Sequence, residues 1–570
     1  MLTLRYEAWE LAPEGVITKA DKGNTITILT KTEYDKKIAD ILNSGDFTKI
    51  SDPTCNFQKQ ILSILKNNKS ILPNNNEYYA KIMNPSPPLL YGLLKLHKDN
   101  NPVRPVVSYI NAPSYKLCQI LAKTLPSMIN FQSKFAIKNS FELLDNLKNI
   151  EVPHNATLVS FDVKSLFTSI PTHELSSIIY ELIDKSNLNI IVKSDLITII
   201  ETCLEQNYFQ YNNEIFKQKD GLPMGSPISP LFAEIFMADF EKKLFKNKSS
   251  LISKINYWAR YVDDIFCIWS GTERNLNSFL TLLNSINPRI QFTIEKGINT
   301  INFLDVTIIK QSNRLQFDIY RKPTTTDTVI HSQSHQSWQI KMSPFHSLIH
   351  RLVMFPLSPE NFKKELNIIK QIAINNGYKC SLIDNMLKKK QKKILMKNFY
   401  SANSKDNNNY RLLNYIPNLT NKISNNLNKI GCKTINVNKR NLGQILLNNK
   451  DKTNVKNKSG VYRVDCNDCD AVYIGQTGRN LDIRIKEHVK SINNLQHSSG
   501  LATHCIVNNH KINENSIKLL HRETKGRRLN YIEQLEILKS VKNENNVNDQ
   551  QGFLNTFFIT PIVNSLNPPP

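Results

Sequence analysis

Two adjacent aspartates, Asp263 and Asp264, stand inside an otherwise apolar and aromatic stretch of the sequence. Residues 255–269 predict a β-hairpin that carries both acids at its turn. Adjacent carboxylates repel each other, so a divalent cation that neutralises them is the best explanation for the pair. The chemistry that fits is a metal-assisted nucleotidyl transfer, which needs a further carboxylate from elsewhere in the chain.

The candidate for that further carboxylate is Asp162. It follows the mostly apolar residues 156–161, which predict a buried strand that ends at the acid. We expect Asp162, Asp263 and Asp264 together to hold two Mg²⁺ ions. Phe167 follows shortly afterwards and is a candidate to lie under the sugar of an incoming nucleotide, where it would exclude a 2′-hydroxyl.

A turn rich in glycine and proline lies between these acids, at residues 221–230. Its backbone is restricted, and it leads into the apolar residues 231–240, which predict a helix. The small side chains leave room for template bases near the backbone. Pro223, Met224 and Gly225 are therefore candidates for contact with template or nucleotide.

Two more strands are predicted downstream, at residues 292–296 and 301–306. Lys296 in the first is a candidate to protonate the pyrophosphate leaving group, although a lysine near a strand end is more often solvent-facing. An isolated Asp-Asp pair is usually a solvated turn, but the joint occurrence of these blocks favours catalysis. In their order they resemble the palm of a reverse transcriptase.

Cationic side chains stand among apolar residues in three other segments, at residues 17–24, 91–108 and 320–335. Lys95 and Arg104 are the candidates for contact with a triphosphate or a template backbone, because arginine binds phosphate bidentately and lysine supplies a point charge. Each segment taken singly fits a solvated loop about equally well. Together they resemble Penelope-like retroelement reverse transcriptases, a group similar to telomerase catalytic subunits in its palm.

A second set of candidate residues lies near the C-terminus. Residues 459–464 and 471–477 predict two strands separated by a short turn, so that Tyr462 and Tyr473 face one another across a hairpin. A predicted helix follows at residues 481–489. The pattern resembles a GIY-YIG nuclease domain, with the first tyrosine in Gly-Val-Tyr and the second in Tyr-Ile-Gly.

Hydrolysis of a phosphodiester needs a base for water, a cation for the transition state and a carboxylate for a metal. A spacing of four places Arg484 and His488 on one helical face. The resemblance implies that Tyr462 or Tyr473 helps to activate or position water, that Arg484 stabilises the phosphate and that His488 assists proton transfer. It also implies that Glu533 holds one Mg²⁺ and that Asn564 completes the site. The competing interpretation is a small mixed domain whose tyrosines are cross-strand packing pairs.

Four residues inside this region have the ligand types of a structural Zn²⁺ site. Cys466 and Cys469 form a C-x-x-C pair, and His504 and His510 follow downstream. The five residues between the histidines are at the long end of the common spacing, so unrelated cysteines and histidines are the alternative. The nuclease domains of Penelope-like elements carry a similar Cys and His insertion, which favours Zn²⁺.

The composition agrees with a protein that binds polyanions. The 73 basic and 49 acidic residues give a net charge of +24 and a pI near 9.4. The other cysteines are scattered without regular spacing, which fits a reducing compartment. No apolar run is long enough to span a bilayer, so we expect a soluble, intracellular protein without membrane partners. Its expected location is the nucleus, and the cytoplasm during synthesis and RNA binding.

The fold class predicted from these blocks is a multidomain α/β protein, with a right-hand polymerase and a small α/β GIY-YIG nuclease domain. The expected divisions are an N-terminal extension, fingers and palm, a helical thumb, a linker and the nuclease, at residues 1–85, 86–335, 336–429, 430–457 and 458–570. The Lys-rich residues 388–393 in the thumb are a candidate nuclear signal or duplex contact, or simply a solvated helix face.

The resemblance implies an RNA-directed DNA polymerase and DNA endonuclease that acts by target-primed reverse transcription. Its partners would be an RNA template, a DNA target and primer, and deoxynucleoside triphosphates. One alternative is a catalytically silent nucleic-acid-binding protein derived from such an element. Another is an intron-type reverse transcriptase with a different nuclease, which residues 91–108 and 320–335 disfavour.

Overall fold

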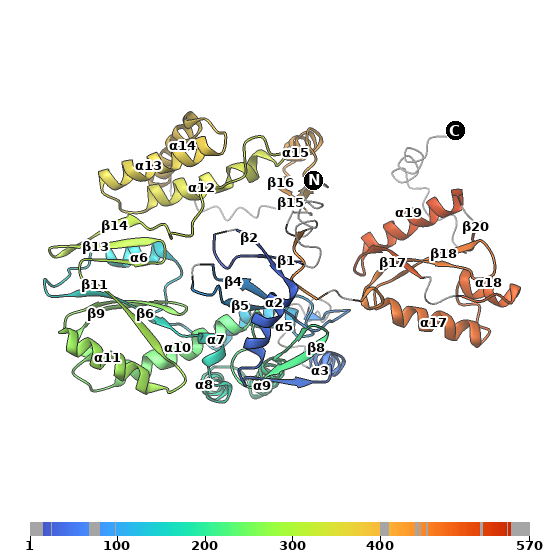
Figure 1. The fold of residues 1–570 in the computed structure, drawn as a ribbon, viewed down its shortest axis with the longest axis horizontal. Helices are drawn as coiled ribbons and strands as arrows, with labels where there is room; N and C mark the ends of the chain where they lie inside the picture. The colour runs from blue at the N-terminus through green and yellow to red at the C-terminus, as the bar shows by residue number, and fades with distance from the viewer. Residues whose placement is uncertain are drawn as a thin grey trace.

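The computed structural model describes residues 15–548 of the 570, apart from residues 24, 68–79, 97, 400–409, 439–442, 444–445, 452–453, 513–516 and 544. Asn564 lies outside the described residues. Figure 1 shows the palm and the three helices that follow it at one end of the molecule and a smaller α/β unit at the other. Among the helices described, none combines the length and the apolar character that crossing a membrane requires.

A four-stranded antiparallel sheet forms the centre of the palm. Its order is β11 (Phe292–Gly297), β6 (Thr157–Val163), β10 (Asp264–Trp269) and β9 (Ile255–Tyr261). Both faces are covered: Ile265 and Cys267 pack with α10 (Ser229–Lys246) and α11 (Glu273–Ile286), whereas the alternate residue Phe266 packs on the other side. Burial on both faces explains why β10 is apolar without alternation after its first residue.

The second face of the palm sheet packs against a three-stranded antiparallel sheet and the helix α6 (Ser140–Leu147). The strands are β12 (Thr300–Phe303), β13 (Val306–Gln311) and β14 (Arg314–Ile319). The prediction of one strand over residues 301–306 is wrong, because the chain reverses there. Leu304 adopts φ +54°, which makes it part of a hairpin turn between β12 and β13.

A five-stranded sheet forms the fingers. Its order is β3 (Phe47–Ile50), β8 (Glu214–Gln218), β7 (Tyr208–Tyr211), β4 (Leu89–Leu94) and β5 (Val103–Ser108). The sheet therefore combines residues from three separated parts of the chain. The hairpin of β1 (Gly15–Lys19) and β2 (Ile26–Thr30) joins it through a bridge between Ala20 and Leu94. The sheet and its neighbours are connected by α2 (Lys31–Leu42), α3 (Thr54–Asn67), α5 (Tyr115–Met128), α7 (Leu166–Ser169), α8 (Thr172–Asp184) and α9 (Ile190–Glu205).

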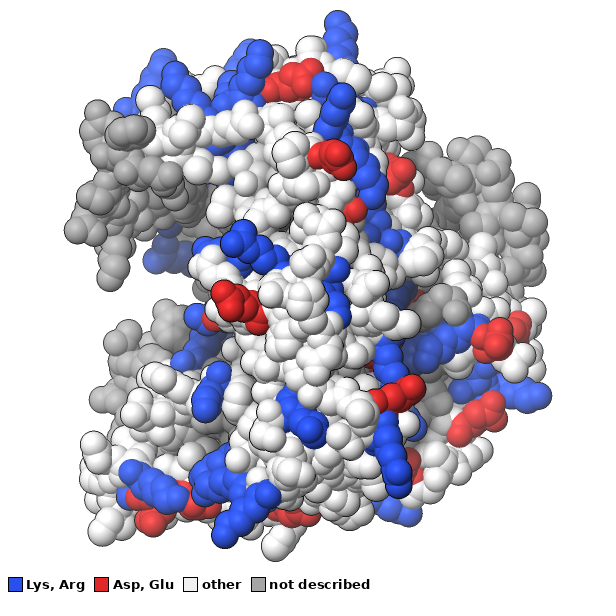
Figure 2. All heavy atoms as spheres, turned by 90° about the vertical axis from the view of Figure 1, so that its left-hand side faces the viewer, with Lys and Arg blue, Asp and Glu red and all other residues white. Residues whose placement is uncertain are grey.

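Three helices follow the palm and pack around their own apolar cluster. They are α12 (Trp338–Met354), α13 (Pro359–Asn375) and α14 (Cys380–Phe399). Ser337 and Ser358 cap the first two through their hydroxyls, which accept hydrogen bonds from backbone N–H groups of the first turn. Lysine and arginine side chains project from this end of the molecule (Figure 2).

The polar, Asn- and Lys-rich stretch that follows contains a small unit which its composition did not predict. The strands β15 (Tyr410–Asn414) and β16 (Lys433–Val437) are parallel and are joined by α15 (Leu419–Lys429). Beyond it, residues 446–451 lie on the fingers. Asn448 binds both Gly15 and Ile17 through its side-chain amide, and Asp451 accepts hydrogen bonds at the β7–β8 turn.

The C-terminal unit is a four-stranded sheet between helices. The order is β19 (Lys518–Arg522), β17 (Gly460–Asp465), β18 (Ala471–Thr477) and β20 (Asn545–Asn546), and the short 3₁₀ turn Val455–Asn457 precedes it. Helices α17 (Leu481–Asn493) and α18 (Gly500–Asn508) cover one face. Helix α19 (Arg527–Asn543) covers the other (Figure 1).

Candidate functional site

The three aspartates singled out in the sequence meet at one end of the palm sheet. Asp264 pairs with Tyr261 to close a two-residue turn, and it pairs with Asp162 of β6 on its other side. The turn itself is held by a hydrogen bond from the N–H of Val163 to the carbonyl of Asp263, at 3.1 Å. Strand pairing thus places carboxylates from two distant parts of the chain side by side.

The electrostatics of this end of the sheet favour a bound cation. Burial raises the pKa of Asp264 to about 6, and the negative charges of Asp263 and Asp162 add to the shift. Burial and Asp263 also raise the pKa of Asp162. A divalent cation would remove both penalties at once, and carboxylate oxygens are the donors that Mg²⁺ prefers. The donor set therefore fits Mg²⁺.

A buried arginine that the sequence analysis missed contacts the turn that carries Asp263. Arg260 is fully buried, and its guanidinium donates to Glu241 at 2.9 Å and to both carboxylate oxygens of Glu234 at 2.8 and 3.0 Å. It also donates to the carbonyl of Val262 at 3.3 Å. Burial acts to raise the pKa of Glu234, but the hydrogen bonds from Arg260 hold it below its usual value. The one available signal was a basic residue inside an apolar strand.

The glycine-proline turn lies beside the segment that follows Asp162. The N–H of Leu222 donates to the carbonyl of Phe167 at 2.8 Å. Gly225 has φ +79°, and a Cβ there would lie 2.0 Å from the carbonyl oxygen of Val107 in β5. Glycine is therefore required because the turn packs closely against the fingers. Pro223 is buried and Met224 packs partly into the fingers core.

A carboxylate that the sequence analysis missed, Asp220, holds this turn in place. It accepts hydrogen bonds from the backbone N–H and the hydroxyl of Thr172, at 3.0 and 2.7 Å, and from the N–H of Gly221 at 2.8 Å. Arg289 forms an ion pair with it. Burial opposes ionisation, but these hydrogen bonds lower the pKa of Asp220 to about 2. Asp220 thus links the turn to the start of α8.

The predicted cationic residues fall into two groups. Lys95 and Arg104 lie at neighbouring ends of β4 and β5, and Arg104 forms a 3.0 Å ion pair with Asp21. Burial lowers the pKa of Lys95, and the charge of Arg104 adds to this effect. Lys296 is placed differently. Its ammonium binds Glu273 at 2.8 Å and Asn277 at 3.1 Å, so it points toward α11.

The hydroxyl of Tyr462 is the centre of a second group of residues, in the C-terminal unit. Tyr462 is fully buried, and its hydroxyl lies 2.7 Å from Nε2 of His488 and accepts a hydrogen bond from Nε of Arg484 at 3.3 Å. Both partners come from one face of α17, as their spacing of four predicts. Burial lowers the pKa of His488 to about 4, so its ring is neutral at pH 7.

Two further residues of the predicted set, Tyr473 and Glu533, lie near this hydroxyl. Tyr462 pairs with Gly475, so Tyr473 is its diagonal neighbour and the ring centroids are 6.5 Å apart. A Cβ on Gly475 would lie 2.5 Å from the hydroxyl of Tyr462, so only glycine leaves room for that ring. Glu533 approaches from α19. Burial raises the pKa of its carboxyl to about 7, although hydrogen bonds from Gln476 act to lower this pKa.

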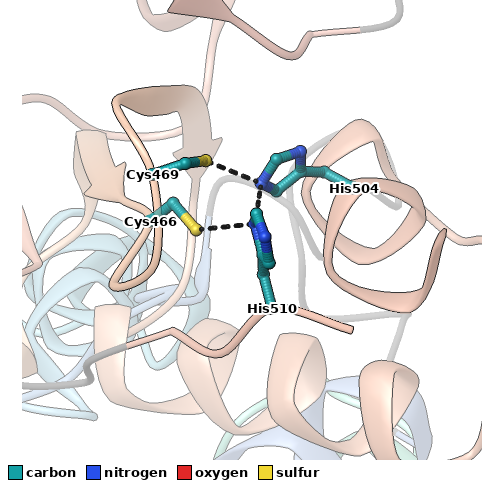
Figure 3. Close-up of side chains that lie close together, drawn as sticks. All are labelled: Cys466, Cys469, His504 and His510. Carbon is teal, nitrogen blue, oxygen red and sulfur yellow. Dashed lines mark hydrogen bonds between the residues drawn. The ribbon is translucent and has the colours of Figure 1, made fainter. Parts of the chain in front are cut away.

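Two cysteines and two histidines converge beside this group (Figure 3). Their ligand atoms all lie within 4.8 Å of one another. The two sulfur–nitrogen distances are 3.5 Å, from Cys466 to His510 and from Cys469 to His504, and the two ring nitrogens are 3.2 Å apart. A tetrahedral Zn²⁺ with ordinary bond lengths gives edges of about 3.6 and about 3.3 Å. The donor set and its spacing therefore fit Zn²⁺.

The sequence also matches known families in two regions. Residues 96–297 match the family described as reverse transcriptase (RNA-dependent DNA polymerase), and residues 328–388 match an animal helix-turn-helix domain. No curated protein matches the chain. The first region contains all three aspartates, and it is a reverse transcriptase domain. That family implies Mg²⁺, an RNA template and nucleotides.

Several solved polymerase structures are similar to this chain at low identity. The telomerase of Candida albicans, in complex with the TWJ fragment of telomeric RNA, is 10% identical with a TM-score of 0.48, over 67% of this chain and 68% of that one. Apo telomerase of Candida tropicalis is 12% identical with a TM-score of 0.38, over 63% and 65%. The BmCPV RNA-dependent RNA polymerase at elongation state is 12% identical with a TM-score of 0.34, over 60% and 31%. Similarities at this level say nothing of a shared substrate.

Mg²⁺ binding to the palm should weaken as the pH falls. Because the pKa of Asp264 is about 6, a proton competes with the cation below that pH, and the apparent affinity at pH 5 should be about tenfold lower than at pH 8. Without Mg²⁺, the raised pKa of Asp264 means that its protonated form stabilises the folded chain. This contribution is fully present below the ordinary pKa of an aspartate, and it is lost as the pH rises through about 6. Thermal unfolding with and without Mg²⁺ measures both effects.

The matched control for this experiment is Asp264→Asn, which removes the titrating group. In that variant the stabilisation by Mg²⁺ should be small and should not depend on pH between 5 and 8. An equal Mg²⁺ stabilisation of the parent at pH 5 and pH 8 would contradict the assignment of Asp264 as a ligand.

Removal of Zn²⁺ should destabilise the C-terminal unit. The purified chain is expected to contain one zinc per molecule by elemental analysis, and Cys469→Ser should lose it, because one of four ligands is gone. The control is Cys432→Ser, which lies outside the cluster and should keep the metal. Equal zinc contents in the two variants would rule out the site.

Proposed function

We propose that this chain is an RNA-directed DNA polymerase fused to a DNA endonuclease, of the Penelope-like type, which acts by target-primed reverse transcription. The observation that carries the polymerase part is the strand register that sets Asp162 opposite Asp264 within the reverse transcriptase domain. In this proposal the nuclease nicks a DNA target, and the polymerase extends the freed 3′-hydroxyl while it copies an RNA template.

The polymerase residues form two sets, one that binds metal and one that binds phosphate. Asp162, Asp263 and Asp264 hold two Mg²⁺ ions, which when bound activate the 3′-hydroxyl and offset the charge of the triphosphate. Lys95 and Arg104 bind the triphosphate from the fingers. Lys296 is less suited to protonate pyrophosphate, because its ammonium already binds Glu273 and Asn277.

The contacts of the Tyr462 hydroxyl support the nuclease part of the proposal. The neutral ring of His488 can accept a hydrogen bond from this hydroxyl at its Nε2 atom, 2.7 Å away, which orients the oxygen of Tyr462 to position water. Arg484 donates to the same oxygen and supplies the positive charge for a phosphate. Glu533 holds one Mg²⁺, whose charge would favour the ionised form of this buried carboxyl.

The second candidate function is a catalytically silent nucleic-acid-binding protein derived from such an element. The net charge of +24 is the observation that favours it, because charge alone supports binding of RNA and DNA. The complete set of carboxylates at the palm argues for catalysis instead. In either case we propose a nuclear location.

Primer extension tests the polymerase. The parent chain should extend a DNA primer on an RNA template with Mg²⁺, and Asp263→Asn should reduce the rate by at least about 100-fold, because one metal ligand is lost. The matched control is Asp239→Asn, an acid of α10 that pairs with Lys243 and should leave the rate unchanged. Absence of extension by the folded parent would favour the silent binding protein.

In the same assay, the variant Phe167→Ala should begin to accept ribonucleotides, because the side chain that would exclude a 2′-hydroxyl is removed. Unchanged sugar selectivity would contradict this role of Phe167.

Plasmid nicking tests the nuclease separately. The parent chain should convert supercoiled DNA to open circles with Mg²⁺, and Glu533→Gln should abolish this while primer extension remains. Glu536→Gln is the matched control on the same helix, since Glu536 binds His521 and Lys539. Equal nicking by parent and Glu533→Gln would refute the assigned metal ligand.

A further inference from the structure

A small hollow lies where the N-terminal hairpin meets the loop that follows the palm. Its volume is about 300 Å³, and it is lined by two lysines, three threonines and one glycine: Lys22, Gly23, Lys322, Thr324, Thr325 and Thr326. The two loops are about 300 residues apart in the sequence. No carboxylate is among the lining residues.

Backbone contacts hold the two loops together. Gly23 has φ +86°, and a Cβ there would lie 2.6 Å from the carbonyl oxygen of Thr324, so only glycine permits this approach. The N–H of Asp21 donates to the carbonyl of Leu94, which fixes the first loop to the fingers. The second loop is a turn closed by a 2.8 Å hydrogen bond from the N–H of Thr325 to the carbonyl of Lys322.

The two lysines of the hollow differ from the neighbouring arginines in that they form no ion pair with a described residue. The neighbouring arginines are engaged, Arg104 with Asp21 and Arg321 with Glu365. Neither Lys22 nor Lys322 forms an ion pair with any residue that the structure describes, and both are exposed. Two ammonium groups and three hydroxyls that converge without a protein anion are the donors that a phosphate group takes.

The two lysines of the hollow act electrostatically on the aspartates of the palm. The charge of Lys22 acts on both Asp162 and Asp264, and the charge of Lys322 acts on Asp264, in each case in the direction that lowers the pKa. A ligand held in the hollow would therefore be within electrostatic reach of the site where nucleotidyl transfer takes place.

We propose that Lys22 and Lys322, with the hydroxyls of Thr324, Thr325 and Thr326, form a subsite for a phosphate group of a polymerase substrate. This inference rests on the proposed function. The phosphate belongs either to the triphosphate of the incoming nucleotide or to the backbone of the primer strand, and the chemistry of recognition is the same for both. The subsite forms only when the first loop of the fingers touches the loop that leads into the thumb.

The test compares Lys22→Ala, Lys322→Ala and the double variant with the parent. The control is Lys217→Ala, an exposed lysine of β8 outside the hollow. Steady-state extension gives KM for the nucleotide, and fluorescence anisotropy gives Kd for a primer–template whose primer ends in a dideoxynucleotide. Loss of one charge-assisted contact should change one of these constants by about tenfold. Lys22→Arg and Lys322→Arg should keep most of the affinity.

Each outcome decides a separate question. A raised KM for the nucleotide with unchanged Kd assigns the phosphate to the triphosphate, and a raised Kd assigns it to the primer strand. Values within twofold of the parent in all variants overturn the subsite. If the parent does not extend primers, the polymerase proposal fails. The subsite is still tested by the anisotropy measurement and by thermal stabilisation with inorganic pyrophosphate, because neither measurement requires turnover.

Discussion

The buried guanidinium of Arg260 is the interaction on which the catalytic end of the palm depends. Its two carboxylate partners, Glu234 and Glu241, stand on α10, so the group ties the main palm helix to the strand that leads into the aspartate turn. It also binds the carbonyl of Val262, a β-branched residue at φ +57°. A conformation of that kind costs about 1–3 kcal/mol and persists only where its surroundings impose it. The hydrogen bond from the buried guanidinium to this carbonyl is one of the contacts that hold it.

The C-terminal unit uses the same principle with a different group. A buried polar atom, the hydroxyl of Tyr462, fixes the side chains from α17, and a glycine opposite it leaves the space that the ring needs. In both places a buried polar group orients the side chains around it. Leaving that group without hydrogen-bond partners would cost more free energy than ordering those side chains. Precise placement of flexible, charged side chains therefore depends on buried polar groups, here the guanidinium of Arg260 and the hydroxyl of Tyr462.

The sequence predicted the apolar framework better than its irregular points. The hairpin at residues 255–269 and the strand before Asp162 follow from mostly apolar residues, and these predictions are confirmed. The turn at Leu304 was missed because an apolar residue with positive φ gives no turn signal. Arg260 was missed because its partners lie 19 and 26 residues earlier, and pairing at that distance leaves no local pattern. The chemical roles of the site residues stay predictions, because residue types alone do not measure them.

The segment at residues 446–451 has a consequence for how far the C-terminal unit can travel. While Asp451 is bound at the β7–β8 turn, the chain from there to Gly460 spans at most about 30 Å, even when fully extended. If this segment leaves the fingers, the tether instead begins at Val437 and reaches about 80 Å. A few hydrogen bonds to the β7–β8 turn and the N-terminal hairpin thus set the volume that the C-terminal unit can sample. They also set the local concentration of that unit at any point on a nucleic acid held by the palm.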